Sequence, residues 1–405
     1  MSTDYSHIAA SKAFEPTEQY EVLRSQCPVH HVTDFDPEFY VVSRFEDVVA
    51  TLKQPAMWVN GKGPGVFYQE SGVLGTTDDP DHQRHRHVLR DAFLPTSIAR
   101  LEPRIAELAD HYLDAMLPLG EGDFVPLYAA PLPAVAIAEL FGIPEDERDG
   151  FRQAADDIAT ALSTGNMALY EPAKQQLGDA IDRAMAVRDR LLDAAGAPAE
   201  ASVIGEVLPD DVISRLAVAR RNGTIDGGEA RHLGHQVLVA GHETTTSLLG
   251  MMLYRLIQRP ELMQRLRDNP SLIPIAIEEA LRFDSPAQGL FRTNAQECVL
   301  HGEMIPEGSK LQVLFASANR DPRKFDRPDD FDIDRPQKEL MGHVAFGWGI
   351  HHCIGAPLAR LETKVSFEKI LRRMGDIELA GSPVRNDSFV LHGLTSLPLR
   401  WTVLA

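Results

Sequence analysis

The stretch that decides the fold is FGWGIHHCIG, which runs from Phe346 to Gly355. It holds one of only 3 cysteines in a chain of 405 residues, and it follows neither the helical nor the strand period. Its glycines remove side chains around Cys353, as is required where a backbone approaches a flat, bulky ligand. Pro357 suits the first turn of a helix, so amides at that helix start could donate hydrogen bonds to a sulfur anion.

Three interpretations of Cys353 follow from these residues. The cysteine could be a buried structural residue of a glycine-rich loop. It could share a zinc ion with His351 and His352, but three adjacent residues rarely converge on one tetrahedral ion, and no fourth ligand is suitably spaced. It could also be a thiolate ligand of haem iron, where its electron density assists cleavage of the O–O bond. The stretch alone leaves the choice open.

Composition narrows the class of protein. Hydrophobic residues make up 44% of the chain, enough for a core that buries a sizeable ligand. The formal net charge of −19 argues against a nucleic-acid partner. The chain contains no run of the ~18 apolar residues that a membrane-spanning helix needs. Its three cysteines are far apart, which suggests no disulfide framework and a reducing compartment. We therefore expect a soluble cytoplasmic protein without a membrane or nucleic-acid partner.

The residue pattern along the chain predicts a mainly α protein with a minor β part. Residues 39–44 alternate like a strand, and residues 45–52 read as a short helix. Residues 55–80 are rich in glycine and proline and predict a long loop of the kind that often serves as a lid. Residues 81–281 are mostly helical in pattern. Strand-like segments follow from Cys298, then a helix from about Pro357, and residues 389–404 alternate like paired strands.

A long helix is predicted around VLVAGHETTTSLLGMMLYRLI, residues 237–257. It could begin near Asp226, with Glu229 completing a capping box, and a helix continuing to Gln258 would be on the order of 50 Å long. Its middle is unusual, because Gly241, an acidic residue and three threonines interrupt an apolar sequence. Glycine weakens a helix, and threonine hydroxyls can bond back to carbonyls, so a kink at a packing contact is one explanation.

Two further pairs have helical spacing. Glu279 and Arg282 are three residues apart and can form an ion pair, and His82 and Arg86 are four apart on one helical face. Each pattern is weak alone, since such pairs are common on solvated helices.

Together these motifs resemble those of the cytochrome P450 family, in the family's order. FGxGxHxCxG is similar to its haem-binding signature, AGHETT to its oxygen-activation motif, and Glu279-x-x-Arg282 with Arg335 to its structural ExxR element. The resemblance covers nearly the whole chain. It implies a single domain over residues 1–405 with the cytochrome P450 fold, in which a long central helix lies over a haem and small β-sheets lie at one side.

The resemblance also implies roles for individual residues. Cys353 would be the axial ligand of haem b, and Glu243 and Thr244 would relay protons to dioxygen. The residues expected to bind the haem propionates are His82, Arg86, Arg292 and His351. The residues expected to contact the substrate are Phe67, Val239, Ala240, Leu290 and Leu394.

The expected function is that of a bacterial-type haem-thiolate monooxygenase. It would insert one oxygen atom of O₂ into a small hydrophobic substrate, by hydroxylation or dealkylation, with electrons from a separate ferredoxin or flavodoxin and its reductase. Arg84, Arg90 and Lys364 are candidates for docking that partner. Two alternatives remain: a haem-thiolate peroxygenase or isomerase, against which the Glu243–Thr244 pair argues, and a non-catalytic haem-binding protein.

Overall fold

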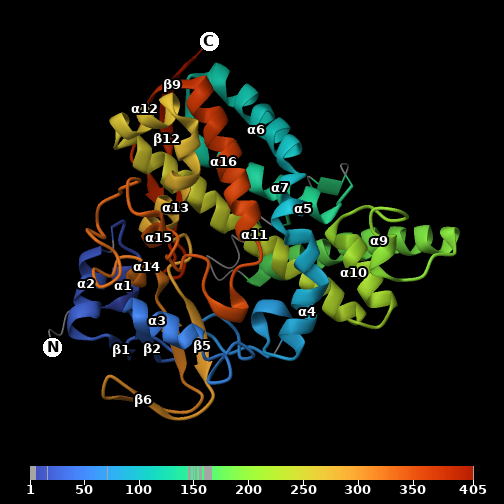
Figure 1. Cartoon of the computed structure of the whole chain (residues 1–405), viewed down its shortest axis with the longest axis horizontal. Coiled ribbons are helices and arrows are strands. Elements are labelled where there is room, and N and C mark those ends of the chain that lie inside the picture. The colour runs from blue at the N-terminus through green and yellow to red at the C-terminus, as the bar shows by residue number, and fades with distance from the viewer. Residues whose placement is uncertain are drawn as a thin grey trace. The chain divides into compact units, whose positions relative to one another are not determined.

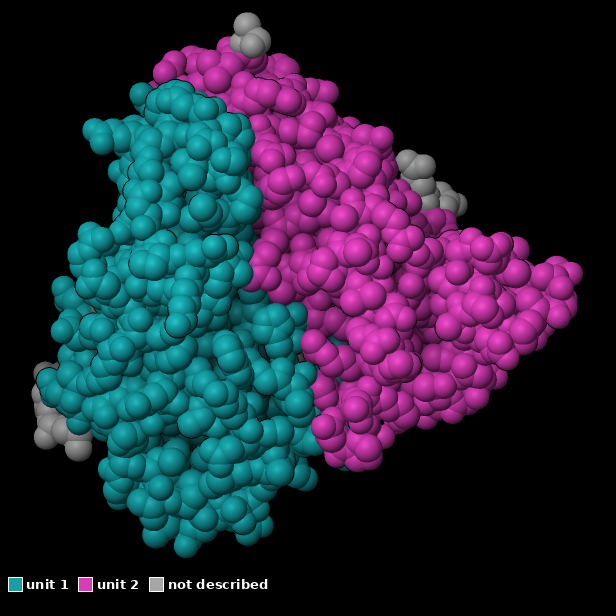
Figure 2. Space-filling view, in the orientation of Figure 1, with its two compact units in different colours: residues 1–78, 247–353, 378–398 teal, residues 79–246, 354–377, 399–405 magenta. Residues whose placement is uncertain are grey.

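The computed structural model describes residues 6–15, 17–70, 72–144, 147–148, 150, 153–154, 157–158 and 167–404. The chain divides into two compact units, each assembled from three segments (Figure 2). The first unit comprises residues 1–78, 247–353 and 378–398, and the second comprises residues 79–246, 354–377 and 399–405. The predicted mainly α class with a minor β part is confirmed.

The first unit contains a five-stranded sheet in the order β1-β2-β8-β5-β3. Its strands are β1 (Val29–Val32), β2 (Phe39–Val42), β3 (Trp58–Val59), β5 (Leu290–Asn294) and β8 (Lys310–Val313). Strands β2 and β8 run parallel, and the other neighbours are antiparallel. All four residues of β2 are buried. Alternate residues of β2 join two different core clusters, so both faces of the sheet are covered, which explains its continuous apolar sequence.

Two pairs of short strands complete the β structure of this unit. Strands β6 (Cys298–Leu300) and β7 (Glu303–Ile305) form the hairpin expected after Cys298. Strand β10 (Val384–Arg385) pairs with β11 (Leu394–Ser396). Residues 389–404 form two paired strands, as their alternation predicts, but the two do not pair with each other, because β12 (Pro398–Val403) belongs to a different sheet. Alternation specifies a strand, but tertiary packing selects its partner.

Helices surround the sheet of the first unit. The predicted helix at residues 45–52 is confirmed as α3 (Phe45–Leu52). The other helices that lie wholly in this unit are α1 (His7–Ser11), α2 (Thr17–Gln26), α12 (Pro260–Asp268), α13 (Ile273–Asp284), α14 (Phe315–Ala318) and α15 (Gln337–Leu340).

The second unit is largely helical. Its helices are α4 (Asp81–Arg90), α5 (Pro95–Ala99), α6 (Glu102–Met116), α7 (Pro131–Phe141), α9 (Met167–Ala195), α10 (Val212–Arg221) and α16 (Ala356–Arg373). Helix α16 lies beside α6 (Figure 1), and Lys369 of α16 forms an ion pair with Asp110 of α6 at 2.5 Å. A small sheet in the order β4 (Glu121–Asp123), β12 and β9 (Met374–Leu379) borders these helices.

The predicted long helix is α11 (Gly227–Ile257), about 46 Å long at 1.5 Å per residue. It continues without a break through Gly241. The predicted capping box is confirmed: the amide of Glu229 donates to the Asp226 carboxylate, and the amide of Asp226 donates to the Glu229 carboxylate, each at 2.8 Å.

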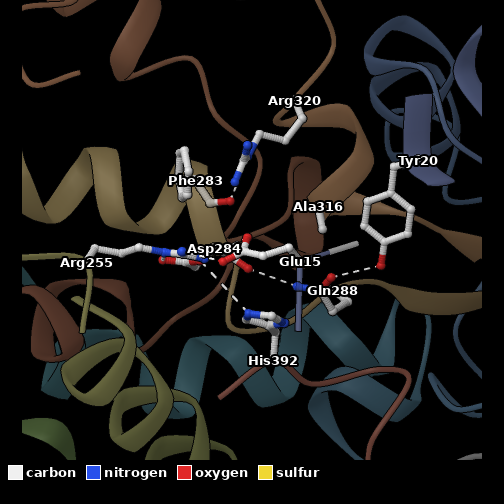
Figure 3. Close-up of a pocket in the computed structure, with 9 residues that line it drawn as sticks. All are labelled: Glu15, Tyr20, Arg255, Phe283, Asp284, Gln288, Ala316, Arg320 and His392. Atoms are coloured by element: carbon white, nitrogen blue, oxygen red, sulfur yellow. Dashed lines mark hydrogen bonds and ion pairs between the residues drawn. The ribbon is translucent and has the colours of Figure 1, made fainter. Parts of the chain in front are cut away.

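A buried charge cluster joins three segments of the first unit (Figure 3). Arg255, near the end of α11, forms ion pairs with Asp284 at 2.7 Å and with Glu15 at 2.5 Å. The Arg320 guanidinium lies 3.4 Å from the centre of the Phe283 ring. Opposite charges surround a cavity of about 10 Å³, room for one water molecule. The cluster therefore ties the N-terminal segment to α11 and α13.

No helix in the described part of the chain combines the length and the apolar character needed to cross a membrane.

Candidate active site

Cys353 ends a tight loop of the first unit. The amide of Cys353 donates to the carbonyl of Phe346 at 2.9 Å, which closes the loop, and the Cys353 side chain is exposed. Gly347 and Gly349 have φ angles of +71° and +73°. Residues other than glycine rarely adopt this conformation, so the two glycines allow the turns that present the thiol.

The same loop packs against α3. A Cβ atom at Gly349 would lie only 2.7 Å from the carbonyl oxygen of Leu52, so glycine is required by contact as well as by φ. The neighbouring Trp348 remains 38% exposed, with the Lys53 ammonium 5.9 Å from the centre of its ring. The loop thus displays an exposed aromatic side chain five residues before Cys353, beside a cation from the end of α3.

His351 ends η8 (Gly349–His351), a single 3₁₀ turn, and is half-buried. Among the described residues, no three His, Cys, Asp or Glu side chains come together as a metal site would require. The alternative of a zinc site at His351, His352 and Cys353 therefore gains no support from the geometry.

Arg292 of β5 is a buried cation with few partners. It is 4% exposed, and its one hydrogen bond in the described structure runs from Nη1 to the carbonyl of Phe291 at 2.8 Å. Burial lowers its pKa to about 10, and the charge of Asp78 opposes this only in part. A guanidinium has five N–H groups and a high desolvation cost. The remaining donors suit an anionic ligand, and a carboxylate matches their geometry.

Helix α4 carries His82 and Arg86 in the second unit. His82 is buried, with Nδ1 3.2 Å from the Asp79 carboxylate, and Arg86 is half-buried one turn later. The predicted helix and the shared face of the two residues are confirmed.

Glu229 holds α4 against the start of α11. Arg84 donates to its two carboxylate oxygens at 2.6 and 2.9 Å, and His85 Nε2 lies 3.0 Å from Oε1. The hydrogen bonds from Arg84 lead the effects that lower the pKa of Glu229 to about 2. Since both basic residues lie on α4, Glu229 fixes the helix that carries His82 and Arg86.

The middle of α11 is closely packed on one side. A Cβ atom at Gly241 would lie 3.3 Å from Ile137 of α7, so the glycine admits that side chain. His242 is buried, and its Nε2 lies 3.1 Å from the carbonyl oxygen of Ala130, so this side chain packs within the protein.

The opposite side of α11 is accessible. Ala240 is exposed and Glu243 and Thr244 are half-buried, although Leu238 and Leu248 on the same helix are 0% and 2% exposed. The Thr244 hydroxyl donates to the Ala240 carbonyl at 3.0 Å. Its oxygen therefore keeps lone pairs that can accept a hydrogen bond from a water molecule.

Comparison with known proteins identifies the family. The family model for cytochrome P450 matches residues 37–375. The chain is 33% identical over 383 residues to cytochrome P450 107B1 of Saccharopolyspora erythraea, covering 89% of each. It is also 33% identical over 413 residues to cytochrome P450 monooxygenase PikC of Streptomyces venezuelae, covering 98% of this chain and 94% of PikC. The chain belongs to the cytochrome P450 family.

A solved P450 structure supports the same assignment. The chain is similar to CYP109Q5 of Chondromyces apiculatus, with a TM-score of 0.84, 32% identity, and coverage of 98% of this chain and 97% of that one. The protein is therefore a haem-thiolate monooxygenase, an oxidoreductase whose family uses a cysteine-ligated haem, O₂, hydrophobic substrates and redox partners. The buried cation at Arg292 and the exposed thiol at Cys353 fit such a group.

The predicted substrate residues of this P450 differ in accessibility. Phe67 and Leu290, in the first unit, are 60% and 37% exposed. Leu394 is buried at the start of β11. In the second unit, Ala240 is exposed and Val239 is half-buried. Four of the five side chains are thus at least partly open, and Leu394 is enclosed by protein.

The proposed docking residues are already paired in the P450 structure. Arg84 binds Glu229, as described above, and Lys364 forms an ion pair with Glu102 at 2.8 Å. Arg90 lies 3.0 Å from the carboxylate of its neighbour Asp91. Carboxylates neutralise all three, which weakens them as docking residues.

Sequence reasoning missed several residues around these sites. Glu229 was recognised only as a helix cap. Glu362 and Lys310 were not singled out, because α16 carries several charged residues and Lys310 is the first residue of its strand, so the sequence does not show that either is buried. Both are buried, at 1% and 0% exposed.

Proposed function

We propose that Cys353 is the axial thiolate ligand of haem b in this P450, and that His82, Arg86, Arg292 and His351 bind the haem propionates. The observation that carries the proposal is Arg292, which is buried with most of its N–H groups unused within the described structure. When bound, the haem supplies the chemistry of O₂ activation. The surrounding residues hold it and place its carboxylates against positive charge.

We further propose that Glu243 and Thr244 pass protons to dioxygen. Both lie on the accessible side of α11, and the Thr244 hydroxyl can accept a hydrogen bond from water while it donates to Ala240. A carboxyl group and an ordered hydroxyl can together carry a proton through water. This pair favours a monooxygenase over the peroxygenase or isomerase alternative, which needs no such relay.

The absorption spectrum of the dithionite-reduced, carbon monoxide-bound protein tests the ligand. We expect the strongly red-shifted Soret band of thiolate ligation in the parent and its loss in Cys353→Ala. Cys298→Ala is the matched control, because it removes a different thiol, one that is partly buried, and it should keep the band. Loss of the band in both variants, or in neither, would contradict the assignment of Cys353.

Thr244→Ala tests the proton relay. We expect the same carbon monoxide spectrum as the parent, but a smaller share of consumed electrons recovered in product, because general acid assistance of this kind contributes about 10²–10⁴-fold. Thr246→Ala is the control, since that buried hydroxyl donates to the His242 carbonyl. Equal coupling in parent and Thr244→Ala would exclude the relay.

We propose a small hydrophobic organic substrate, oxidised by hydroxylation or dealkylation. The support is the exposure of Phe67 and Leu290, which leaves two large apolar side chains available to an apolar ligand. Val239, Ala240 and Leu394 are the other proposed contacts. Screening for compounds that shift the ferric spin state would identify the substrate, and Phe67→Ala should weaken its binding by about tenfold.

We propose a small acidic electron carrier, a ferredoxin or a flavodoxin with its reductase, as the redox partner in a reducing cytoplasm. The support is Trp348, which is exposed on the loop that ends at Cys353 and has the Lys53 ammonium beside its ring. Tryptophan is enriched among the residues that anchor interfaces, and surface charges steer the approach of an oppositely charged partner. Lys53→Glu should slow reduction by the carrier severalfold at low salt, with less effect at high salt. An unchanged rate at low salt would exclude this anchor.

A further inference from the structure

Residues 60–69 form a loop of the first unit that is fastened at its beginning. The Asp78 carboxylate accepts hydrogen bonds from the amides of Asn60 and Gly61, each at 2.8 Å. The side-chain amide of Asn60 donates to the carbonyl of Gly75 at 3.0 Å. This loop is part of the predicted long loop of residues 55–80, of which only Ser71 lies outside the described residues, and it contains Phe67, an expected substrate contact.

The middle of the loop is bonded to the sheet. The amide of Phe291 in β5 donates to the carbonyl of Pro64 at 2.8 Å. The Tyr68 hydroxyl donates to the carbonyl of Gly308, just before β8, also at 2.8 Å. Val66 is buried in the core cluster that contains Phe291. The loop therefore lies on the sheet.

Lys310 of β8 makes the strongest of these attachments. Its ammonium donates to the carbonyls of Lys62 and Gly63 at 2.8 and 2.7 Å, and it lies 5.0 Å from the centre of the Tyr68 ring. Gly63 has a φ of +89°, which turns the chain so that two successive carbonyls meet one ammonium. A Cβ at this position would also lie 3.1 Å from Gln69.

Lys310 has no carboxylate to balance its charge in the described structure. Its side chain is fully buried, and every hydrogen bond that it makes there goes to the loop. Burial, and then the nearby charge of Arg292, lowers its pKa to about 8. Keeping an ammonium in such a place is costly, so the loop carbonyls and the tyrosine ring are what hold it there.

We propose that Lys310 is a positioning residue for substrate recognition, because its ammonium holds residues 62–68 on the sheet and thereby sets the place of Phe67. The inference rests on the proposed function, in which Phe67 contacts the substrate. Lys310 itself touches the loop and acts on the substrate only through it.

Hydrogen exchange of the haem-loaded protein tests the attachment. Lys310→Met keeps the length of the side chain and removes its charge and donors. We expect the amides of residues 62–69 to exchange at least about tenfold faster, because charge-assisted hydrogen bonds are lost. Lys369→Met, which removes the ion pair of α16 with Asp110, is the matched control and should leave these amides unchanged.

Binding of two azoles that ligate haem iron tests the consequence for recognition. The dissociation constant of the bulky clotrimazole should rise about tenfold in Lys310→Met, while that of imidazole should stay within about twofold. Lys310→Gln, which keeps N–H donors without the charge, should lie between the parent and Lys310→Met in both measurements. It also provides the test if the methionine variant does not fold.

Unchanged exchange in both Lys310 variants would overturn the attachment. Faster exchange with equal effects on the two azoles would overturn the role in recognition. Failure of the proposed contact at Phe67 gives a different result, since Phe67→Ala would then leave substrate binding unchanged while the exchange of residues 62–69 still reports on Lys310.

Discussion

Arg282 and Arg292 are buried arginines of the same unit, ten residues apart in the sequence. They differ in how many of their side-chain N–H groups have a hydrogen-bond acceptor. The five N–H groups of Arg282 all have acceptors: two donate to Glu279 at 2.7 Å, and three donate to backbone carbonyls at 2.8 to 3.0 Å. Within the described residues, Arg292 makes one side-chain hydrogen bond, to a carbonyl. The first arrangement is complete within the protein, and the second leaves donors for a ligand.

The complete arrangement extends to a second arginine. Arg335 donates to Glu279 at 3.2 Å and to Glu339 at 3.1 Å, and its other N–H groups reach carbonyls of the preceding loop. Glu279 is 0% exposed and compensates both arginines. This is the predicted ExxR element, and it joins α13 to the loop of residues 326–335. Buried charges in this P450 are thus of two kinds. Some are compensated within the protein and stabilise the fold, and others have unused donors that can bind a ligand.

Among these variants, Glu279→Ala should have the largest effect on stability, because two buried arginines share the carboxylate that it removes. Glu279→Ala leaves Arg282 and Arg335 buried without a carboxylate between them, and we expect a loss of about 3–5 kcal/mol in the free energy of unfolding. Urea titration measures it. Glu261→Ala, on the exposed first turn of α12, should stay within about 0.5 kcal/mol. Similar losses in the two variants would refute the distinction.

Arg292→Met should separate stability from haem retention. It removes a cation whose burial the charge of Asp78 compensates only in part, so the haem-free form should be as stable as the parent or more so. The haem-loaded form should lose haem about tenfold faster or more, because a charged hydrogen bond of about 1.5–3 kcal/mol is gone. Haem transfer to apomyoglobin measures the rate. A destabilised haem-free form with unchanged haem transfer would place Arg292 with Arg282 as a structural residue.

Glu362 of α16 is a third case, a buried acid that is held neutral. It is 1% exposed, its Oε2 has no hydrogen-bond partner in the described structure, and burial raises its pKa well above 4.5. The folded protein therefore keeps a proton that the unfolded chain releases above pH 4.5. Stability is full below that pH and falls as the pH rises towards the folded pKa, by up to about 1.4 kcal/mol per pH unit.

Glu362→Gln should remove this pH dependence. Glutamine has nearly the same shape and does not ionise, so parent and variant should have similar stability at pH 4.5, and the variant should be the more stable at pH 8. Urea titrations between those pH values give the comparison. If the stability of the parent falls no faster with rising pH than that of Glu362→Gln, then Glu362 ionises without destabilising the folded protein.

Local signals explain why so much of the fold could be predicted. Helix α3 ends where its apolar pattern ends, and α11 begins one residue after the Asp226 cap, because capping and periodicity are properties of neighbouring residues. The partner of β11 could not be predicted in this way. Pairing β11 with β10 depends on segments that are brought together only in the folded chain.

The same distinction applies to the candidate site. Cys353, Glu243 and Thr244 stand in recognisable motifs, and the structure shows their thiol, carboxyl and hydroxyl accessible or half-buried. Lys310 belongs to no motif. Its partners are the carbonyls of Lys62 and Gly63, about 250 residues earlier, and carbonyls have no sequence signature. The ion pair of the proposed docking residue Arg84 could not be foreseen for a related reason, since Glu229 is far from Arg84 in sequence.

Glu229 gives the smallest expected effect, because its charge cluster is only partly buried. Its pKa is lowered to about 2, mainly by Arg84, so the stabilisation is present above pH 4.5 and is lost as the pH falls through about 2. We expect Glu229→Gln to cost about 1 kcal/mol at pH 7 and less at pH 3, after screening by solvent. Glu107→Gln, which breaks the more exposed pair with Arg104, should cost less than about 0.5 kcal/mol. Because Glu229 also holds α4, its variant should release haem faster, whereas Glu107→Gln should not. Equal haem release in the two variants would show that α4 keeps His82 and Arg86 in place without this carboxylate.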